Sequence, residues 1–272
     1  MEYKLPKLPA RPQISHKGTF GKVLNIAGSS YMPGAAYLSS ISALKVGAGY
    51  VELASYEKVL TSVSHIAPEI VLAPINAIPE LIQSCTVAAI GCGLSISKKS
   101  EKLFDNCLKN LRKKNIVIDA DGLNILSGKE YYFDTNAILT PHPKEAARLL
   151  GCSSEDILSE IELSAKRISE KYNCITVLKT NKTIVTDGIN IYKNTSGCSA
   201  LAKAGSGDVL CGMITGLVAQ GMNLFDASAL GVYLHGLAGE LAAKDLSEYG
   251  VLASDQLRYI PLAIKHYLAD SI

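Results

Sequence analysis

The sequence AKAGSGDVLCGMITGLVAQG (residues 202–221) joins a glycine-rich turn to the start of an apolar helix. Gly205 and Gly207 allow the chain to turn so that free backbone N–H groups point outward at the helix N-terminus, where the helix dipole adds positive potential. Such a turn is suited to binding a phosphate. Asp208 follows directly. Because a carboxylate repels a phosphate, its presence there indicates a chemical task.

Asp208 is a candidate general base. A carboxylate beside a bound phosphate can take a proton from a hydroxyl group as that hydroxyl attacks the phosphoryl group. We expect the field of the helix N-terminus to keep this carboxylate ionised. A second interpretation stays open at this point, since aspartate at a helix start often serves as the N-cap. The segment before the turn is not an apolar strand, and no P-loop sequence occurs, so another architecture must hold the phosphate.

Outward from this turn, short apolar runs alternate with segments of helical periodicity. The period is clear in 97–114 and 155–172, and the last third of the chain is mainly helical. The segment 183–192 predicts a hairpin that turns at Asp187 and Gly188. The alternation predicts an α/β fold, with a mostly parallel central sheet and helices on both faces. The candidate strands are 22–28, 50–55, 86–93, 115–120, 137–140 and 174–179.

Composition narrows the class of protein. The chain is 48% hydrophobic and 19% charged, which is typical of a globular domain, and it has neither repeats nor a linker, so we expect one domain over 1–272. Its 27 basic and 25 acidic residues are scattered, which argues against nucleic acid or a membrane surface as a partner. Seven scattered cysteines predict reduced thiols, and the N-terminus lacks a signal-peptide core, so we expect a cytoplasmic protein.

Several stretches besides AGSGD carry a resemblance to a known family. They are HKGTFGKVLNIAGSSYMPGAA (16–36), AIGCGL (89–94), IDADGLNIL (118–126), LTPHPKEAARLLG (139–151) and GVYLHGLAGELAA (231–243). In order and spacing they resemble the ADP/ATP-dependent NAD(P)H-hydrate dehydratases of the ribokinase-like superfamily, over about residues 14 to 260. The resemblance implies a ribokinase-like fold. Many bacterial relatives carry an epimerase domain in front, and we expect none here because the chain begins close to the first motif.

The resemblance also implies a repair reaction, in which (S)-NADH or NADPH hydrate is dehydrated with ADP or ATP and Mg²⁺. Phosphorylation of the ring hydroxyl would turn it into a good leaving group. Asp208 would deprotonate that hydroxyl, while the N–H groups of Gly205, Ser206 and Gly207 would stabilise the transferring phosphoryl group. The partners would thus be NAD(P)H hydrate and an adenine nucleotide, and relatives suggest a homo-oligomer, often a tetramer.

Further site residues follow from the same resemblance. The substrate-binding positions would be Ala36, Gly93, His142 and Asp208. The nucleotide-binding positions would be Lys179, Thr180, Asn181, Lys182 and Thr183, together with Gly205, Ser206 and Gly207. Glu145 would organise magnesium through water. Each assignment has a structural alternative: tight packing for the small residues, a structural hydrogen bond for the histidine, and an ordinary first-turn helix acid for the glutamate. The chain departs from the family pattern at Lys144, Thr180 and Cys198-Ser199.

Other polar residues are weaker candidates. Asp119 and Asp121 end a strand at the expected cleft, where a metal or substrate role stays open, and we expect one of them instead to orient loops by accepting backbone N–H bonds. His235 lies in an apolar helical segment and is expected to be a packing histidine. Two other functions stay open: a ribokinase-like kinase that phosphorylates a small alcohol, and a noncatalytic nucleotide sensor.

Overall fold

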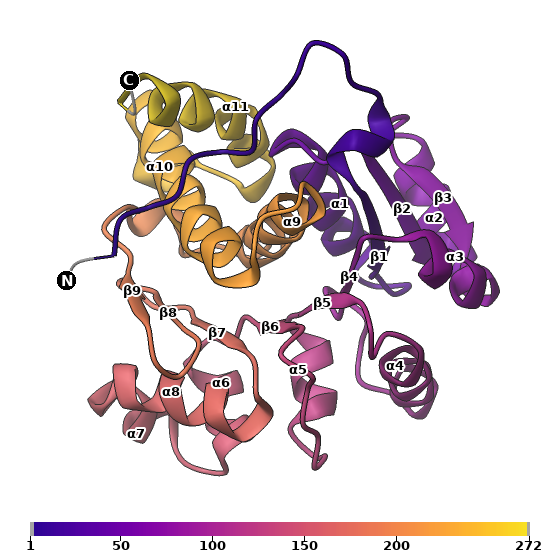
Figure 1. The fold of residues 1–272 in the computed structure, drawn as a ribbon, viewed down its shortest axis with the longest axis horizontal. Helices are drawn as coiled ribbons and strands as arrows, with labels where there is room; N and C mark the ends of the chain where they lie inside the picture. Colours follow the sequence, from indigo (N-terminus) through magenta and orange to yellow (C-terminus); the bar gives the residue numbers. More distant parts are fainter. Residues whose placement is uncertain (1–2, 271–272) are drawn as a thin grey trace.

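One nine-stranded sheet runs through the molecule with helices on both faces, as the computed structural model of residues 3–270 shows (Figure 1). The strand order is β3-β2-β1-β4-β5-β6-β7-β8-β9. Strands β1 to β7 are parallel, β8 is antiparallel to β7, and β9 is antiparallel to β8, so the predicted α/β class is confirmed. The strands are β1 (Lys22–Ile26), β2 (Tyr50–Ser55), β3 (Val71–Pro74), β4 (Val87–Ile90), β5 (Asn115–Ile118), β6 (Ala137–Leu139), β7 (Ile175–Leu178), β8 (Ile184–Thr186) and β9 (Ile191–Lys193).

Two hydrophobic cores lie on opposite faces of the sheet. Strand β4 shows why, since Val87 and Ala89 belong to one core and the alternate residues Ala88 and Ile90 to the other. The first core is covered by α1 (Pro33–Lys45), α2 (Glu57–Ser64), α9 (Ser206–Ala219), α10 (Leu224–Gly250) and α11 (Ala253–Asp270). The second is covered by α3 (Ile78–Ser84), α4 (Lys98–Asn110), α5 (Asp121–Leu126), α6 (Pro143–Leu150), α7 (Ser154–Ser159) and α8 (Ile161–Tyr172).

The structure differs from the sequence-based prediction in three elements. Strand β3 was not predicted. The single helix expected over 155–172 is two helices, because the backbone at Glu160 leaves the helical region (φ −136°, ψ 56°). The hairpin is present, and its turn is wider than a two-residue turn. Thr186 Oγ1 accepts a hydrogen bond from the Gly188 N–H, and Asp187 Oδ1 accepts from Ile189 and Asn190.

Glycines bring α9 close to α1. A Cβ on Gly212 would lie 2.1 Å from the carbonyl oxygen of Ser39, and one on Gly216 would lie 2.6 Å from that of Ala43. Because real Cβ atoms do not approach backbone so closely, these two positions require glycine. The contact fixes α9 against the sheet with its N-terminus at the carboxyl ends of the strands.

Four neighbouring strands each place a polar residue just beyond their carboxyl ends. Cys92 follows β4, Asp119 follows β5, Thr140 follows β6 and Lys179 follows β7. Since these strands are parallel neighbours, the four residues meet at one edge of the sheet, where α/β proteins bind their ligands.

Two sequence-based expectations concern the chain as a whole. The seven cysteines are free thiols, as expected. Among the helices of residues 3–270, none has both the length and the hydrophobicity needed to cross a membrane.

Candidate active site

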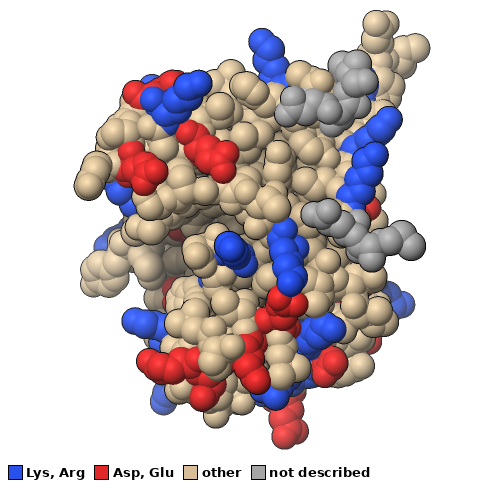
Figure 2. Space-filling model, turned by 90° about the vertical axis from the view of Figure 1, so that its left-hand side faces the viewer, with Lys and Arg blue, Asp and Glu red and all other residues tan. Residues whose placement is uncertain are grey.

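A cleft of about 720 Å³ lies at the carboxyl edge of the sheet. Figure 2 looks at the side of the molecule that carries β9, and this face is hollowed, with basic side chains beside the hollow. Many residues that the sequence assigned to substrate or nucleotide line the cleft, together with parts of the segment 194–203 and of α10. Those assigned residues are His142, Lys179, Thr180, Asn181, Thr183, Ser206 and Gly207.

The glycine turn at the start of α9 has the geometry of an anion cradle. Gly205 is the N-cap and has φ 92°, a left-handed conformation that favours glycine. Within residues 3–270 no side chain caps this helix, and although the Ser206 N–H donates to the carbonyl oxygen of Lys203, the N–H groups of Gly207 and Asp208 stay available for a ligand. Asp208 is the third residue of the helix and not its N-cap. The capping interpretation of Asp208 is therefore wrong.

The pKa of Asp208 is shifted in the direction opposite to the one expected. We expected the helix N-terminus to hold this carboxylate ionised, yet burial and the nearby carboxylate of Asp119 raise its pKa from 3.8 to about 6. A hydrogen bond with Cys92 and the charge of Lys179 act in the opposite direction and are weaker. A carboxyl group with this pKa is still mostly ionised at pH 7 and is a stronger base than an ordinary aspartate.

A buried ion pair lies beside the cradle. Asp119 is 1% exposed, and its Oδ1 accepts hydrogen bonds from Lys179 Nζ at 2.6 Å and from Thr140 Oγ1 at 2.7 Å. Burial alone would lower the pKa of Lys179, but Asp119 and Glu145 outweigh it and the pKa is raised. A Cβ on Gly207 would lie 3.4 Å from Lys179 Nζ, which places a permanent positive charge at the cradle.

Asp119 is the residue that sequence reasoning undervalued. The sequence did place Asp119 directly after the buried strand β5. Lys179 holds the corresponding position after β7, two strands along the sheet. Asp121 does not pair with Asp119; its Oδ2 accepts a hydrogen bond from the backbone N–H of Ser95 at 2.7 Å. The expectation that one of the two acids would bind backbone N–H is confirmed.

His142 and Glu145 cap α6 reciprocally. His142 Nδ1 accepts hydrogen bonds from the backbone N–H groups of Lys144 and Glu145, and Glu145 Oε2 accepts from the backbone N–H of His142 at 2.8 Å. His142 Nε2 lies 3.4 Å from Glu145 Oε1. Burial raises the pKa of Glu145 to about 7, while burial and Lys179 lower the pKa of His142. His142 thus makes the structural hydrogen bond and also lines the cleft.

The remaining assigned residues lie around this centre. Ala36 is fully buried in α1, and Gly93, with φ 61°, packs against Met32 and Ala35 at the start of that helix. Lys182 is exposed beyond the cleft lining. Ligand contacts for these residues stay predictions.

His235 is buried, as expected of a packing histidine, and it also lines the cleft. Its Nε2 lies 3.1 Å from both the hydroxyl and the carbonyl oxygen of Ser206, and the same hydroxyl contacts the amide of Gln256. Burial lowers the pKa of His235 to about 4, so the ring is neutral at pH 7. These contacts fix the first residue of α9, a role that the sequence did not reveal.

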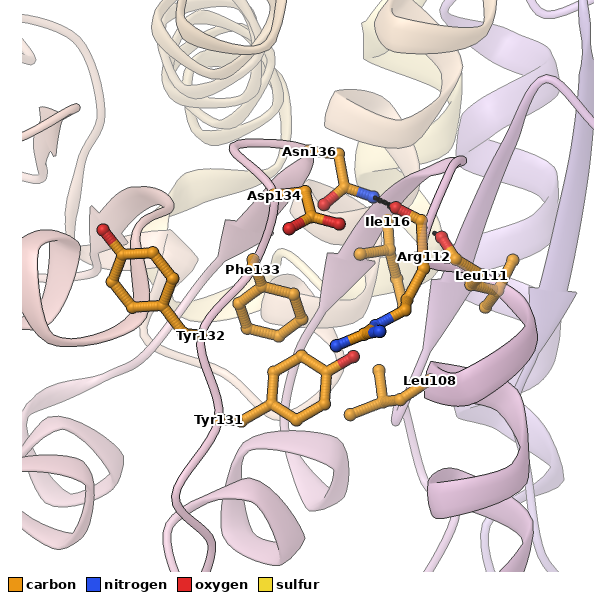
Figure 3. A pocket seen from close by; sticks show the side chains of 9 residues that line it. All are labelled: Leu108, Leu111, Arg112, Ile116, Tyr131, Tyr132, Phe133, Asp134 and Asn136. Carbon is orange, nitrogen blue, oxygen red and sulfur yellow. Dashed lines mark hydrogen bonds between the residues drawn. The ribbon is translucent and has the colours of Figure 1, made fainter.

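At the amino ends of β5 and β6, on the opposite edge of the sheet, there is no cavity of comparable volume. Figure 3 shows the hollow that lies there before these strands, filled by its own side chains. The ring centroids of Tyr131 and Phe133 are 4.6 Å apart, and the free volume is about 10 Å³, roughly one water molecule. A nucleotide therefore fits the carboxyl-edge cleft and not this hollow.

Comparison with known proteins identifies the class and then the family. The fold is ribokinase-like: a ribokinase-like superfamily protein from Enterococcus faecalis superposes with a TM-score of 0.88 at 26% identity, over 96% of this chain and 92% of that one. Residues 23–262 match the family model of the NAD(P)H-hydrate dehydratases, and the chain belongs to that family.

Three relatives carry informative names. The ADP-dependent (S)-NAD(P)H-hydrate dehydratase of Neisseria meningitidis is 38% identical over 85% of this chain and 80% of its own. The bifunctional NAD(P)H-hydrate repair enzyme of Coxiella burnetii is 35% identical over 97% of this chain and 55% of its own, so this chain spans about half the length of that relative. The ADP/ATP-dependent NAD(P)H-hydrate dehydratase of Bacillus subtilis, co-crystallised with ATP and Mg²⁺, has a TM-score of 0.85 at 30% identity, over 96% and 94% of the two chains.

Proposed function

We propose that the protein dehydrates (S)-NADH or NADPH hydrate to NAD(P)H, using ADP or ATP. The names of the relatives supply the reaction and the nucleotide. The observation that carries the proposal is that Ser206 and Gly207 of the glycine turn line one cleft together with the Lys179 cation. Asp208 follows Gly207 in the first turn of α9, just outside that lining.

The arrangement accounts for the phosphorylation step, and the substrate itself supplies the driving force of the elimination. Asp208 takes the proton of the ring hydroxyl as that oxygen attacks the terminal phosphoryl group, and the nucleotide leaves as AMP or ADP. The N–H groups of the turn and the ammonium of Lys179 stabilise the charge on the transferring group. In the second step the lone pair of the ring nitrogen of the phosphorylated tetrahydropyridine expels the phosphate, which breaks the C–O bond and leaves an iminium ion. Transfer of a proton from the adjacent ring carbon to the departing phosphate then forms the C=C bond and restores the reduced nicotinamide.

The binding roles follow from position. The loop 179–183, after β7, contacts the nucleotide, and neutral His142 faces the hydrated ring. Ala36 and Gly93 stay part of the proposal as substrate-binding positions, although Ala36 is fully buried.

Glu145 fits a magnesium ion only through water. Its two oxygens already contact His142, and the residue is 4% exposed, so direct coordination would break the cap of α6. A water held by a second lone pair would leave the cap intact. Mg²⁺ bound there with the nucleotide would neutralise phosphate charge.

The test is Asp208→Asn in an assay of hydrated NADH with nucleotide and magnesium, in which the absorbance of reduced nicotinamide returns. We expect turnover to fall by roughly 100-fold or more, the scale of losing a general base. The control is Asp134→Asn, which alters an exposed aspartate at the opposite rim and should leave turnover unchanged. Near-normal turnover in Asp208→Asn would show that the base is another group.

The same assay separates the other functions. A small-molecule kinase would consume nucleotide with a simple alcohol and would not restore the absorbance. A nucleotide sensor would bind nucleotide without turnover, and its binding would not depend on Asp208. The family match disfavours both functions.

A further inference from the structure

Two buried thiols and a buried carboxylate converge next to Asp208. Cys92 lies in the loop after β4, Asp119 follows β5, and Cys211 lies in α9 three residues after Asp208. All three are at most 1% exposed. One potential ligand atom from each lies within 4.8 Å of the other two, and residues 3–270 contain no other such group of histidine, cysteine and acidic side chains.

The carboxylate is oriented toward the thiols. Lys179 and Thr140 both donate hydrogen bonds to Oδ1 of Asp119, whereas Oδ2 faces Cys92 Sγ at 3.8 Å. Hydrogen bonds to one oxygen of a carboxylate are a common way to fix the other oxygen as a metal ligand. The Lys179 ammonium also offsets part of the negative charge that two thiolates would bring.

We propose that Cys92, Asp119 and Cys211 bind a thiophilic divalent cation such as Zn²⁺. The donor set is two sulfurs and one oxygen, all of them types that zinc accepts, and a water molecule would complete the tetrahedron. Ligand atoms around tetrahedral zinc lie about 3.5 Å apart, so the observed spacing needs only a small contraction.

The proposed site would bind zinc in preference to the Mg²⁺ that accompanies the nucleotide. Mg²⁺ prefers oxygen ligands and six-coordinate geometry, whereas thiolates select zinc and related metals. Binding would convert both thiols to thiolates and release their protons to solvent. Cys211 lies about one helical turn after Asp208 in α9, so the charge of the bound cation would lower the pKa of the Asp208 carboxyl group and weaken the base. This inhibitory consequence rests on the proposed function, but the binding itself does not.

Cobalt is the probe for the site, because Co²⁺ bound to thiolates gives a near-ultraviolet charge-transfer band and visible d–d bands. The reduced full-length protein is titrated with Co²⁺ and then with Zn²⁺. We expect one Co²⁺ per chain, thiolate bands, and loss of those bands as zinc displaces cobalt. Cys92→Ser and Cys211→Ala should each weaken Co²⁺ binding at least tenfold. The control Cys152→Ser, at an exposed thiol, should leave it unchanged.

The outcomes are distinct. Thiolate bands that persist when Cys92 and Cys211 are both replaced, or no thiolate bands in the wild-type protein, would overturn the proposal. Near-ultraviolet circular dichroism shows whether each variant is folded. If either Cys92→Ser or Cys211→Ala does not fold, the test is made with the other of these two variants. Metal binding without dehydratase activity would leave the site standing and refute the proposed function. Dehydratase activity that zinc leaves unchanged, in a protein that shows no thiolate bands, would refute the metal site and leave the proposed function standing.

Discussion

At Asp208, the burial that makes the carboxylate a better base also destabilises the fold. The folded pKa is about 6 against 3.8 in the unfolded chain, so the folded state holds the proton more tightly. The free energy of unfolding is highest below pH 4 on this account, falls as the pH rises to about 6, and stays lower above it. Asp208→Asn removes the charge. We expect it to raise the free energy of unfolding at pH 7.5 by up to about 3 kcal/mol.

Denaturant unfolding at pH 4 and pH 7.5 measures this effect. The gain from Asp208→Asn should be small at pH 4 and large at pH 7.5, with Asp134→Asn as the control. A variant that is less stable than the wild type at pH 7.5 would contradict the assigned burial cost.

Asp119 tunes Asp208 and is testable through the pH profile of turnover. Its negative charge is one cause of the raised pKa of Asp208. Asp119→Asn removes that charge and frees Lys179, and both changes favour the ionised form of Asp208. The acidic limb of the kcat profile should therefore move to lower pH. An acidic limb that stays in place or moves upward would show that Asp119 does not act on the base.

The residues of the site differ in how far the sequence could reveal them. Asp208 could be proposed because its chemistry follows from its neighbours in the sequence, a glycine turn at the start of a helix, whereas His142 was assigned from the family resemblance. Asp119 could not be recognised in this way, because its partner Lys179 is 60 residues away and the pair exists only after the strands align. The direction of the Asp208 pKa shift was also out of reach, since it depends on burial.

At the scale of elements, the capping of α6 allows the metal role of Glu145 to be separated from its structural role. Glutamine can accept the same hydrogen bond from the backbone N–H of His142 but has no charge. Glu145→Gln should leave the unfolding temperature nearly unchanged, whereas the Mg²⁺ concentration for half-maximal turnover should rise several-fold. An unchanged Mg²⁺ requirement would limit Glu145 to capping.

The contact between α1 and α9 predicts a strong effect of one methyl group. In Gly212→Ala the new Cβ would meet backbone of α1 at 2.1 Å, so the helices must separate. We expect a loss of about 1–3 kcal/mol in the free energy of unfolding, the usual cost of overpacking. The control is Gly34→Ala in α1, where a Cβ meets nothing within 4 Å and stability should hold or rise slightly. Equal stabilities of the two variants would contradict the tight contact.

Elements were predictable where one physical signal dominated. The central strands are buried on both faces and read as continuous apolar runs. Strand β3 is mostly exposed and ends at Pro74, so it lacked that signal. The apolar period of 155–172 continues across Glu160, and periodicity alone therefore could not reveal the break between α7 and α8.

At the scale of the molecule, the cleft joins both helical layers. Its lining comes from the loop before α6 on one face and from α9 and α10 on the other, with the ends of β7 and β9 between them. A ligand in the cleft contacts all of these segments, which are separated when the chain unfolds. Nucleotide binding should therefore stabilise the whole chain and not one element.

A nucleotide at 100 times its Kd should raise the free energy of unfolding by about 2.7 kcal/mol, visible as a higher unfolding temperature. Gly207→Ala tests where this energy arises. Its Cβ would make only ordinary contact with Lys179, so the fold should persist, yet the methyl group would occupy the anion cradle. We expect this variant to lose most of the thermal shift with ADP or ATP and Mg²⁺, while Asp208→Asn keeps it. A full shift in Gly207→Ala would place the phosphates away from the N-terminus of α9 and remove the physical basis for Asp208 as the base.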